Sequence, residues 1–210
     1  MSHYFDPSPA APSRPSRVTL KLAGFEAELL VDRGVFAASG IDPGTSELLR
    51  AGLGEPGGGP GSDGALLDLG CGYGPITVAL AHRFPRARVW AVDVNRRALE
   101  LVTANAAALG LADRVAPAPP EEVPAELRFD GIWSNPPIRI GKEALHTLLL
   151  DWLPRLLPGA SAWLVVQRHL GSDSLSDWLA ANGWPVKRVG SRKGYRLLQV
   201  GPAGPRPEPA

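Results

Sequence analysis

Short apolar runs alternate with longer amphipathic segments along the chain from residue 65 onward. The short runs are bounded by turn-forming residues, which is typical of buried strands, and they predict strands at Ala65–Leu69, Arg88–Val92, Arg114–Ala116, Phe129–Ser134 and Ser161–Gln167. The segments between them predict helices at Ile76–Arg83, Lys142–Leu157 and Ser172–Asn182, and a further helix that Asn95 would cap and that runs to about Leu109. This regular alternation predicts an α/β fold with a doubly wound, mostly parallel sheet.

Two hairpins are predicted at the ends of this pattern. Val186–Val200 predicts a terminal antiparallel hairpin, which would bring the sheet to seven strands. At the other end, Val18–Leu22 and Phe25–Val31 alternate apolar and polar residues and predict a short hairpin, with a helix following at Ser46–Ala51.

Proline and glycine mark the predicted domain boundaries. The ends of the chain are Pro-rich and nearly free of large apolar side chains, so we expect disordered tails there, and a Gly-rich stretch predicts a flexible loop. The expected organisation is tail 1–17, one domain 18–200 (N-terminal segment 18–52, loop 53–64, core 65–200) and tail 201–210.

Composition excludes several classes of protein. An apolar share of 44% in 210 residues is sufficient for one core. No window approaches the roughly 18 uncharged apolar residues of a membrane span, and the first residues do not resemble a signal peptide, so we expect a cytoplasmic protein. The single cysteine excludes an intrachain disulfide, and the four histidines lack metal-ligand spacing, so no metal is expected.

The charge distribution indicates a nucleic-acid partner only in one part of the chain. The net charge of +1 provides no global argument for nucleic-acid binding. Basic side chains do gather in the carboxyl-terminal part, where such a cluster fits a solvated surface about as well as a phosphate-binding one: Arg168, His169, Lys187, Arg188, Arg192, Lys193 and Arg196.

A glycine loop follows the strand at 65–69, where open α/β sheets bind ligands. Gly70, Gly72 and Gly74 let the backbone approach a ligand closely, and the next helix begins directly after them. Asp93 ends the second strand, where a carboxylate can accept both hydroxyl hydrogens of a ribose. The pattern is therefore that of a nucleoside-cofactor site.

Two features favour S-adenosylmethionine over a dinucleotide at this loop. The third glycine falls one position earlier than in the dinucleotide fingerprint. Asp68 precedes the loop, where its charge suits the cofactor's ammonium group but not a diphosphate. Cys71 has no recognisable base beside it, so it is interpreted as a small buried residue and not as a nucleophile.

Asn135-Pro136-Pro137, after the strand at 129–134, suits the binding of a planar amine. The Asn135 side-chain oxygen and the Pro136 carbonyl can each accept one amine hydrogen, which aims the nitrogen lone pair at a cofactor. The two prolines fix the backbone that presents these acceptors. The sequence therefore predicts methyl transfer onto nitrogen, with Asn135, Pro136 and Pro137 as the catalytic residues.

Together these motifs resemble class I S-adenosylmethionine-dependent methyltransferases, whose fold is Rossmann-like. More narrowly, residues 18–200 resemble the small-methyltransferase-domain family, which includes 16S ribosomal RNA guanine exocyclic-amine methyltransferases and archaeal single-domain relatives. The matching segments are Gly34-Val35-Phe36, Asp42-x-Gly44-Thr45, Asp68 to Gly72, Asp93-Val94-Asn95, Asn105, Ser134 to Ile138, Arg139-x-Gly141-Lys142 and Gly194-Tyr195-Arg196.

The resemblance implies roles for individual residues. Phe36 and Thr45 would close the cofactor pocket, Val94 would pack on adenine, and Ile138, where adenine and glutamine methyltransferases have an aromatic residue, would favour guanine. The expected cofactor-binding residues are Phe36, Thr45, Asp68, Gly70, Cys71, Gly72, Gly74, Asp93, Val94, Ala118 (through its backbone) and Asn135.

The implied substrate is a guanine in RNA, most simply ribosomal RNA or a ribosomal subunit. Arg139, Lys142, Arg168 and Arg196 are the candidates for binding phosphates. The alternatives are another amine (adenine in nucleic acid, a protein glutamine or a small metabolite), a non-catalytic cofactor-binding RNA module, and an NAD-dependent enzyme.

Overall fold

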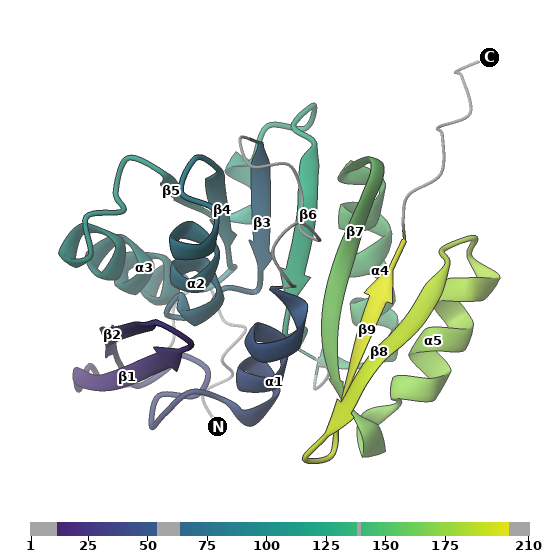
Figure 1. Cartoon of the computed structure of the whole chain (residues 1–210), viewed down its shortest axis with the longest axis horizontal. Helices are drawn as coiled ribbons and strands as arrows, with labels where there is room; N and C mark the ends of the chain where they lie inside the picture. Colours follow the sequence, from purple (N-terminus) through teal and green to yellow (C-terminus); the bar gives the residue numbers. More distant parts are fainter. Residues whose placement is uncertain (1–11, 54–63, 138–139, 202–210) are drawn as a thin grey trace.

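The computed structural model describes residues 12–53, 64–137 and 140–201, so the predicted loop at 53–64 and much of both predicted tails lie outside the described residues. Seven strands form one twisted sheet in the order β5-β4-β3-β6-β7-β9-β8 (Figure 1). Their bounds are β3 Ala65–Leu69, β4 Arg88–Val92, β5 Val115–Ala118, β6 Phe129–Ser134, β7 Leu156–Gln167, β8 Val186–Arg192 and β9 Tyr195–Val200.

Strand direction confirms the predicted fold class. The first five strands in that order run parallel, β9 is antiparallel to β7, and β8 is antiparallel to β9. This is the doubly wound, Rossmann-like sheet with a terminal antiparallel hairpin. None of the helices among the described residues is long and apolar enough to cross a membrane.

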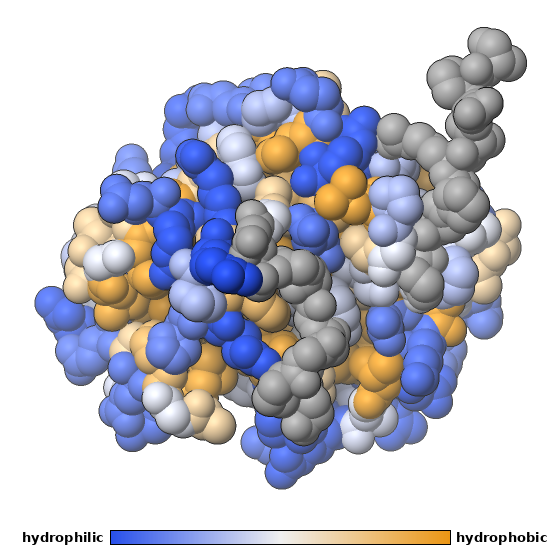
Figure 2. All heavy atoms as spheres, turned by 45° about the horizontal axis from the view of Figure 1, so that its top comes forward, coloured by the Kyte–Doolittle hydropathy of each residue, from blue (hydrophilic) through white to orange (hydrophobic). Residues whose placement is uncertain are grey.

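Helices cover both faces of the sheet. On one face lie α1 (Pro43–Gly52), α2 (Pro75–Arg83) and α3 (Arg96–Ala108), and on the other lie α4 (Lys142–Trp152) and α5 (Ser172–Ala181). Each face buries its own apolar cluster, the first around Trp133 and Leu80 and the second around Phe129 and Leu149. Figure 2 shows apolar and polar side chains interspersed on the face that it presents.

The helix predicted to reach Leu157 ends earlier, at Trp152. Pro154 lies in a short 3₁₀ turn, Leu153–Arg155, and its ring prevents the helix from continuing because it lacks an N–H and clashes with the preceding turn. The chain then enters β7, where Leu156 already pairs with Phe129 of β6.

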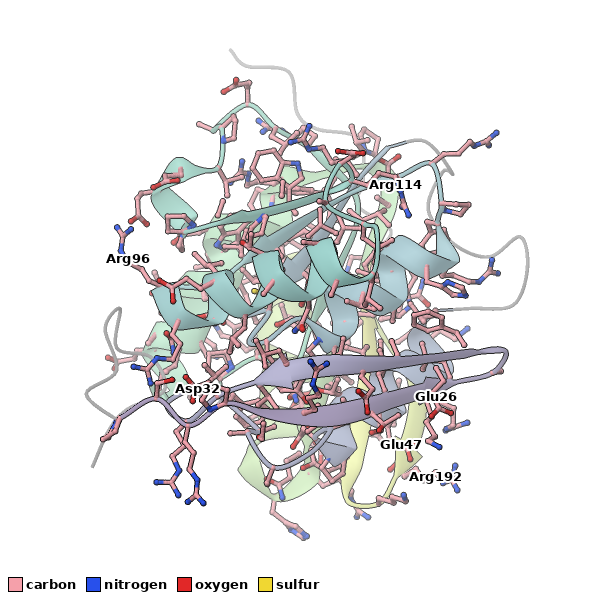
Figure 3. All side chains as sticks on the ribbon, turned by 90° about the vertical axis from the view of Figure 1, so that its left-hand side faces the viewer. Glu26, Asp32, Glu47, Arg96, Arg114 and Arg192 are labelled. Carbon is pink, nitrogen blue, oxygen red and sulfur yellow. The ribbon has the colours of Figure 1, made fainter. Side chains whose placement is uncertain are left out.

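The N-terminal hairpin forms a separate two-stranded sheet, β1 (Ser16–Leu22) with β2 (Phe25–Val31). Figure 3 shows it lying alongside α3. Order begins before the predicted tail boundary at residue 17: β1 begins at Ser16, and Ser13 and Arg14 already donate hydrogen bonds to the buried carboxylate of Asp32. These local hydrogen bonds hold a segment whose composition alone predicted disorder.

Asn105 of α3 ties three parts of the chain together. Its side-chain oxygen accepts a hydrogen bond from Leu30 N at 2.7 Å, and its amide group donates to the carbonyls of Leu30 and Tyr73. We expect Asn105→Ala to lower the free energy of unfolding by about 2–3 kcal/mol, because one buried and two part-buried backbone groups lose their partner. Thermal unfolding measures this, with Asn182→Ala on the protein surface as the control. Equal melting temperatures for the two variants would contradict the bridging role.

Candidate active site

A cavity of about 350 Å³ opens at the carboxyl ends of the parallel strands. Its wall follows the strand order, with Asp93 after β4, Gly70 after β3, Asn135 after β6 and Gln167 at the end of β7. The described residues that line it are Val35, Phe36, Ala37, Asp42, Leu69, Gly70, Gly72, Val92, Asp93, Val94, Asn95, Ala98, Pro120, Asn135, Pro136, Pro137, Leu148, Gln167 and Tyr195.

The glycine loop forms the floor of this cavity. Gly70 and Gly72 have positive φ angles of 76° and 55°, in the left-handed region that glycine adopts without strain. A Cβ added at Gly70 would meet no atom within 4 Å, so the backbone there is open to a ligand. Gly74 does not line the cavity; a Cβ there would lie 3.1 Å from Val102, so this glycine serves close packing of α2 on α3.

Asp93 is held in place by backbone donors. Its two oxygens accept hydrogen bonds from Gly72 N and Asn95 N, each at 2.9 Å. Burial raises the pKa of this carboxyl group, while the backbone hydrogen bonds act in the opposite direction. The remaining lone pairs of a fixed carboxylate on the cavity wall suit a vicinal diol such as that of a ribose.

Asp68 and Cys71 lie beneath the loop. The Asp68 side chain is fully buried; its Oδ2 accepts a hydrogen bond from the Thr77 hydroxyl at 2.6 Å, and its Oδ1 has no partner among the described residues. Asp68 is therefore not on the cavity wall, and any influence on a ligand passes through the loop. Burial raises the pKa of the Cys71 thiol, which fits the interpretation of Cys71 as an unreactive packing residue.

The buried Asp68 makes stability depend on pH. Desolvation raises its pKa to about 7 from an ordinary value of 3.8. Because the folded protein binds this proton more tightly than the unfolded chain, the ionised carboxylate destabilises the fold progressively as pH rises from about 4 to about 7. We expect the melting temperature of Asp68→Asn relative to wild type to rise between pH 5 and pH 8. A difference that stays constant with pH would contradict this electrostatic role.

The orientation of the Asn135 amide is set from α1. Its Nδ2 donates to Asp42 Oδ1 at 2.8 Å and to Thr45 Oγ1 at 3.0 Å. An ionised carboxylate only accepts hydrogen bonds, so the NH₂ group must face Asp42. The side-chain oxygen of Asn135 then points away from α1 and has no partner among the described residues. Asn135 thus presents an acceptor beside the glycine loop.

Most of the residues predicted from the sequence meet at this cavity. Those on its wall are Phe36, Gly70, Gly72, Asp93, Val94, Asn135, Pro136 and Pro137. Thr45 and Cys71 line a small adjoining cavity of about 20 Å³. Ala118 packs in the core instead, and Pro120 forms the wall after β5.

The predicted substrate-binding residues are not brought together. Ile138 and Arg139 lie outside the described residues. Lys142, at the start of α4, and Arg168, just after β7, are exposed and do not line the cavity. Arg196 is an interior group: only 12% of its side chain is exposed, and it forms an ion pair with Asp173 of α5. Its alternation in β9 turns it towards α5, so the prediction that it binds phosphates lacks support.

Sequence reasoning missed several wall residues. Asp42 and Tyr195 belong to segments that match the family without an individual role, and no sequence motif indicates a role for Leu148 or Gln167. Asp42 offers a local indication, since Asp42-Pro43 begins a helix whose N-terminus it caps by accepting from Thr45 N at 3.1 Å. Gln167 and Tyr195 reach the cavity through the pairing of β7 with β9, which no local pattern reveals.

The charge of the lining favours a cationic ligand. Two carboxylates, Asp42 and Asp93, lie on the wall, and no Lys or Arg does so within the described ranges. A dinucleotide diphosphate would meet repulsion there, whereas sulfonium and ammonium groups would meet attraction. Exposed apolar side chains of Phe36 and Val94 offer surfaces for a purine ring. The cavity therefore fits S-adenosylmethionine better than NAD.

Known proteins resemble this chain in both sequence and structure. The uncharacterized protein YbxB of Bacillus subtilis is 31% identical over 200 residues, covering 94% of this chain and 97% of YbxB. Ribosomal RNA small subunit methyltransferase C of Cronobacter sakazakii is 33% identical over 171 residues, covering 79% of this chain. The match covers only 47% of that enzyme, so the chain spans about half the length of this relative.

Among solved structures, the T. thermophilus 16S rRNA N2 G1207 methyltransferase (RsmC), in complex with AdoMet and guanosine, superposes with a TM-score of 0.72 at 26% identity. The superposition covers 90% of this chain and 51% of that one. The family model of the methyltransferase small domain matches residues 26–199. The resemblance predicted from the motifs is thus confirmed, and the chain belongs to the methyltransferase small domain family.

Proposed function

We propose that this protein transfers the methyl group of S-adenosylmethionine to the exocyclic amine of a guanine in ribosomal RNA. The observation behind the proposal is the Asn135 amide, whose NH₂ group is held by Asp42 and Thr45 so that its oxygen remains an acceptor at the cavity. The ribosomal target is supported by the likeness to the small-subunit methyltransferases, which act on 16S rRNA.

The cofactor would occupy the part of the cavity between Asp93 and the glycine loop. Asp93 would accept the ribose hydroxyl hydrogens, and the adenine would pack between Phe36 and Val94. The backbone at Gly70 and Gly72 would leave room for the methionine portion. When bound, S-adenosylmethionine supplies an electrophilic methyl group on sulfur.

The protein's own contribution is to position the amine. Asn135 Oδ1 and the Pro136 carbonyl each accept one amine hydrogen, so the nitrogen lone pair is directed at the methyl carbon. The carbon–nitrogen bond forms as the carbon–sulfur bond breaks, and the product nitrogen then loses a proton to solvent. No strong general base is needed, because the nitrogen becomes acidic once it has been alkylated.

The target base must leave its stack to reach this cavity. Flanking phosphates would be bound by the exposed cations at the same end of the sheet, Lys142 and Arg168. Arg139, which lies outside the described residues, is a third candidate from the sequence. The hairpin of β8 and β9 is a weaker candidate, because its Arg192 already forms an ion pair with Glu47 of α1 at 3.8 Å (Figure 3).

The direct test is transfer of labelled methyl groups to small ribosomal subunits, and to naked 16S rRNA, from cells in which the gene has been deleted. Nucleoside mass spectrometry of the product should show N2-methylguanosine, and the label should be absent from subunits of wild-type cells. Label on adenine or in protein would contradict the guanine target and would identify adenine or a protein side chain as the methyl acceptor.

Asp42→Asn tests how the Asn135 amide is oriented. An asparagine at position 42 can donate as well as accept hydrogen bonds, so the Asn135 amide can adopt either orientation. In the flipped orientation its oxygen faces position 42 and does not accept a hydrogen bond from the substrate. We expect turnover to fall roughly tenfold, with S-adenosylmethionine affinity within about threefold of wild type. Steady-state kinetics and calorimetry measure the two effects. A variant that loses cofactor affinity and keeps its turnover would contradict this role.

A further inference from the structure

The cavity extends beyond Asn135, away from Asp93, onto two strands that the cofactor would not reach. Along the sheet, Asp93, Gly70 and Asn135 follow β4, β3 and β6, while Gln167 and Tyr195 belong to β7 and β9. Asp93 follows β4 and Gln167 ends β7, and these two strands are three positions apart in the sheet. Because adjacent strands are about 4.8 Å apart, the two strands lie roughly 14 Å from each other. Asn135 lies between the cofactor half of the cavity and the half formed by β7 and β9. The second half is therefore the one in which the base that accepts the methyl group can bind.

Gln167 and Tyr195 act as a pair in this half. They are cross-strand partners in the register of β7 with β9, so their side chains lie side by side on the same face of the sheet. The Tyr195 ring packs against Gly44 of α1, where an added Cβ would lie 2.7 Å from the ring. Neither the Gln167 amide nor the Tyr195 hydroxyl has a hydrogen-bond partner among the described residues.

A half-buried amide without a partner on a cavity wall is suited to recognition. Glutamine presents one acceptor and two donor hydrogens in a plane, and a purine edge presents the complementary set. The Tyr195 ring offers an apolar surface beside that amide, and every base can pack on an aromatic ring.

Building on the proposed function, we infer that Gln167 and Tyr195 form the target-base subsite and that Gln167 reads the N1–H and O6 edge of guanine. The amine, N1–H and O6 of guanine follow one another along a single edge. With the amine at Asn135 after β6, this edge continues towards the neighbouring strand β7. There the Gln167 oxygen accepts from N1–H and its NH₂ group donates to O6, while Tyr195 packs on the ring.

Two nucleosides isolate this edge. Guanosine and 2-aminopurine riboside both have the 2-amino group that Asn135 would bind, but only guanosine has N1–H and O6. Their dissociation constants are measured by ligand-observed NMR with S-adenosylhomocysteine present. The proteins compared are wild type, Gln167→Met and the matched control Gln199→Met, which lies in the same sheet away from the cavity.

Wild type is expected to prefer guanosine by roughly tenfold or more, as for other bidentate contacts to a base edge. Gln167→Met should bring the two affinities to within about threefold of each other, and Gln199→Met should keep the preference. If Gln167→Met still prefers guanosine over 2-aminopurine riboside, or if wild type shows no such preference, Gln167 does not recognise the N1–H and O6 edge. The methylation assay tests the proposed function independently of this result. A wild-type protein that binds the cofactor product but neither nucleoside contradicts the guanine target and the subsite together.

The role of Tyr195 is separated by a second pair of variants. Tyr195→Leu should weaken both nucleosides about tenfold, because packing against an aromatic ring is lost, whereas Tyr195→Phe should retain the wild-type affinities. Equal affinities for all three proteins would remove Tyr195 from the subsite.

Discussion

Replacing Asn135 with alanine is expected to lower turnover by about a hundredfold or more, the usual cost of losing a positioned acceptor at a reacting group. The amine would keep only the Pro136 carbonyl, so its lone pair would no longer be fixed in line with the methyl carbon. Affinity for S-adenosylmethionine should stay within a few fold, because in the proposed binding mode Asp93, Phe36 and Val94, and not Asn135, would contact the ribose and adenine. Single-turnover kinetics with saturating cofactor measures the chemical step directly.

The control for this substitution is Asn182→Ala, at the exposed end of α5, which should behave as wild type. A folding defect must also be ruled out, since Asn135 links β6 to α1 through Asp42 and Thr45. Comparison of melting temperatures with and without cofactor serves that purpose. Wild-type turnover in a folded Asn135→Ala protein would remove the proposed mechanism.

The sequence predicted those parts of the site that depend on local backbone. The glycine loop, Asp93 and the Asn135 segment each follow a strand directly, and parallel strands bring their carboxyl ends to one edge of the sheet. Once the alternation of strands and helices is recognised, the meeting of these residues follows. The same reasoning placed Asp68 near the loop but could not predict that its side chain is fully buried beneath it.

Other features depend on contacts between distant parts of the chain. The orientation of Asn135 is set by Asp42, which is 93 residues away along the chain, and the position of Tyr195 is set by the pairing of β9 with β7. The prediction that Arg196 binds phosphates lacks support for a similar reason, because strand alternation turns this side chain towards Asp173 of α5, where only 12% of it is exposed. Proximity to a motif is therefore weak support for phosphate binding by a basic residue. Its position in the strand register is more informative, because it decides which face of the sheet the side chain occupies.

Asp93→Ala is expected to weaken S-adenosylmethionine binding by on the order of a hundredfold or more, because hydrogen bonds from two ribose hydroxyls to a charged acceptor are lost. Gly72 N and Asn95 N also lose their acceptor, so the glycine loop becomes less ordered around the ligand. Removing the carboxylate also removes the desolvation that raises its pKa, which offsets part of the stability lost with these two hydrogen bonds.

Isothermal titration with S-adenosylmethionine and, separately, with NAD measures the effect of Asp93→Ala, and the exposed Asp113→Ala is the matched control. Saturable S-adenosylmethionine binding that only Asp93→Ala abolishes would establish Asp93 as the ribose ligand. Binding of NAD in place of S-adenosylmethionine would contradict the charge argument, because a diphosphate would then be held beside Asp42 and Asp93 without a cation from the described lining. Since the role of Asn135 requires a methyl donor in this cavity, that result would also remove the amine-positioning mechanism.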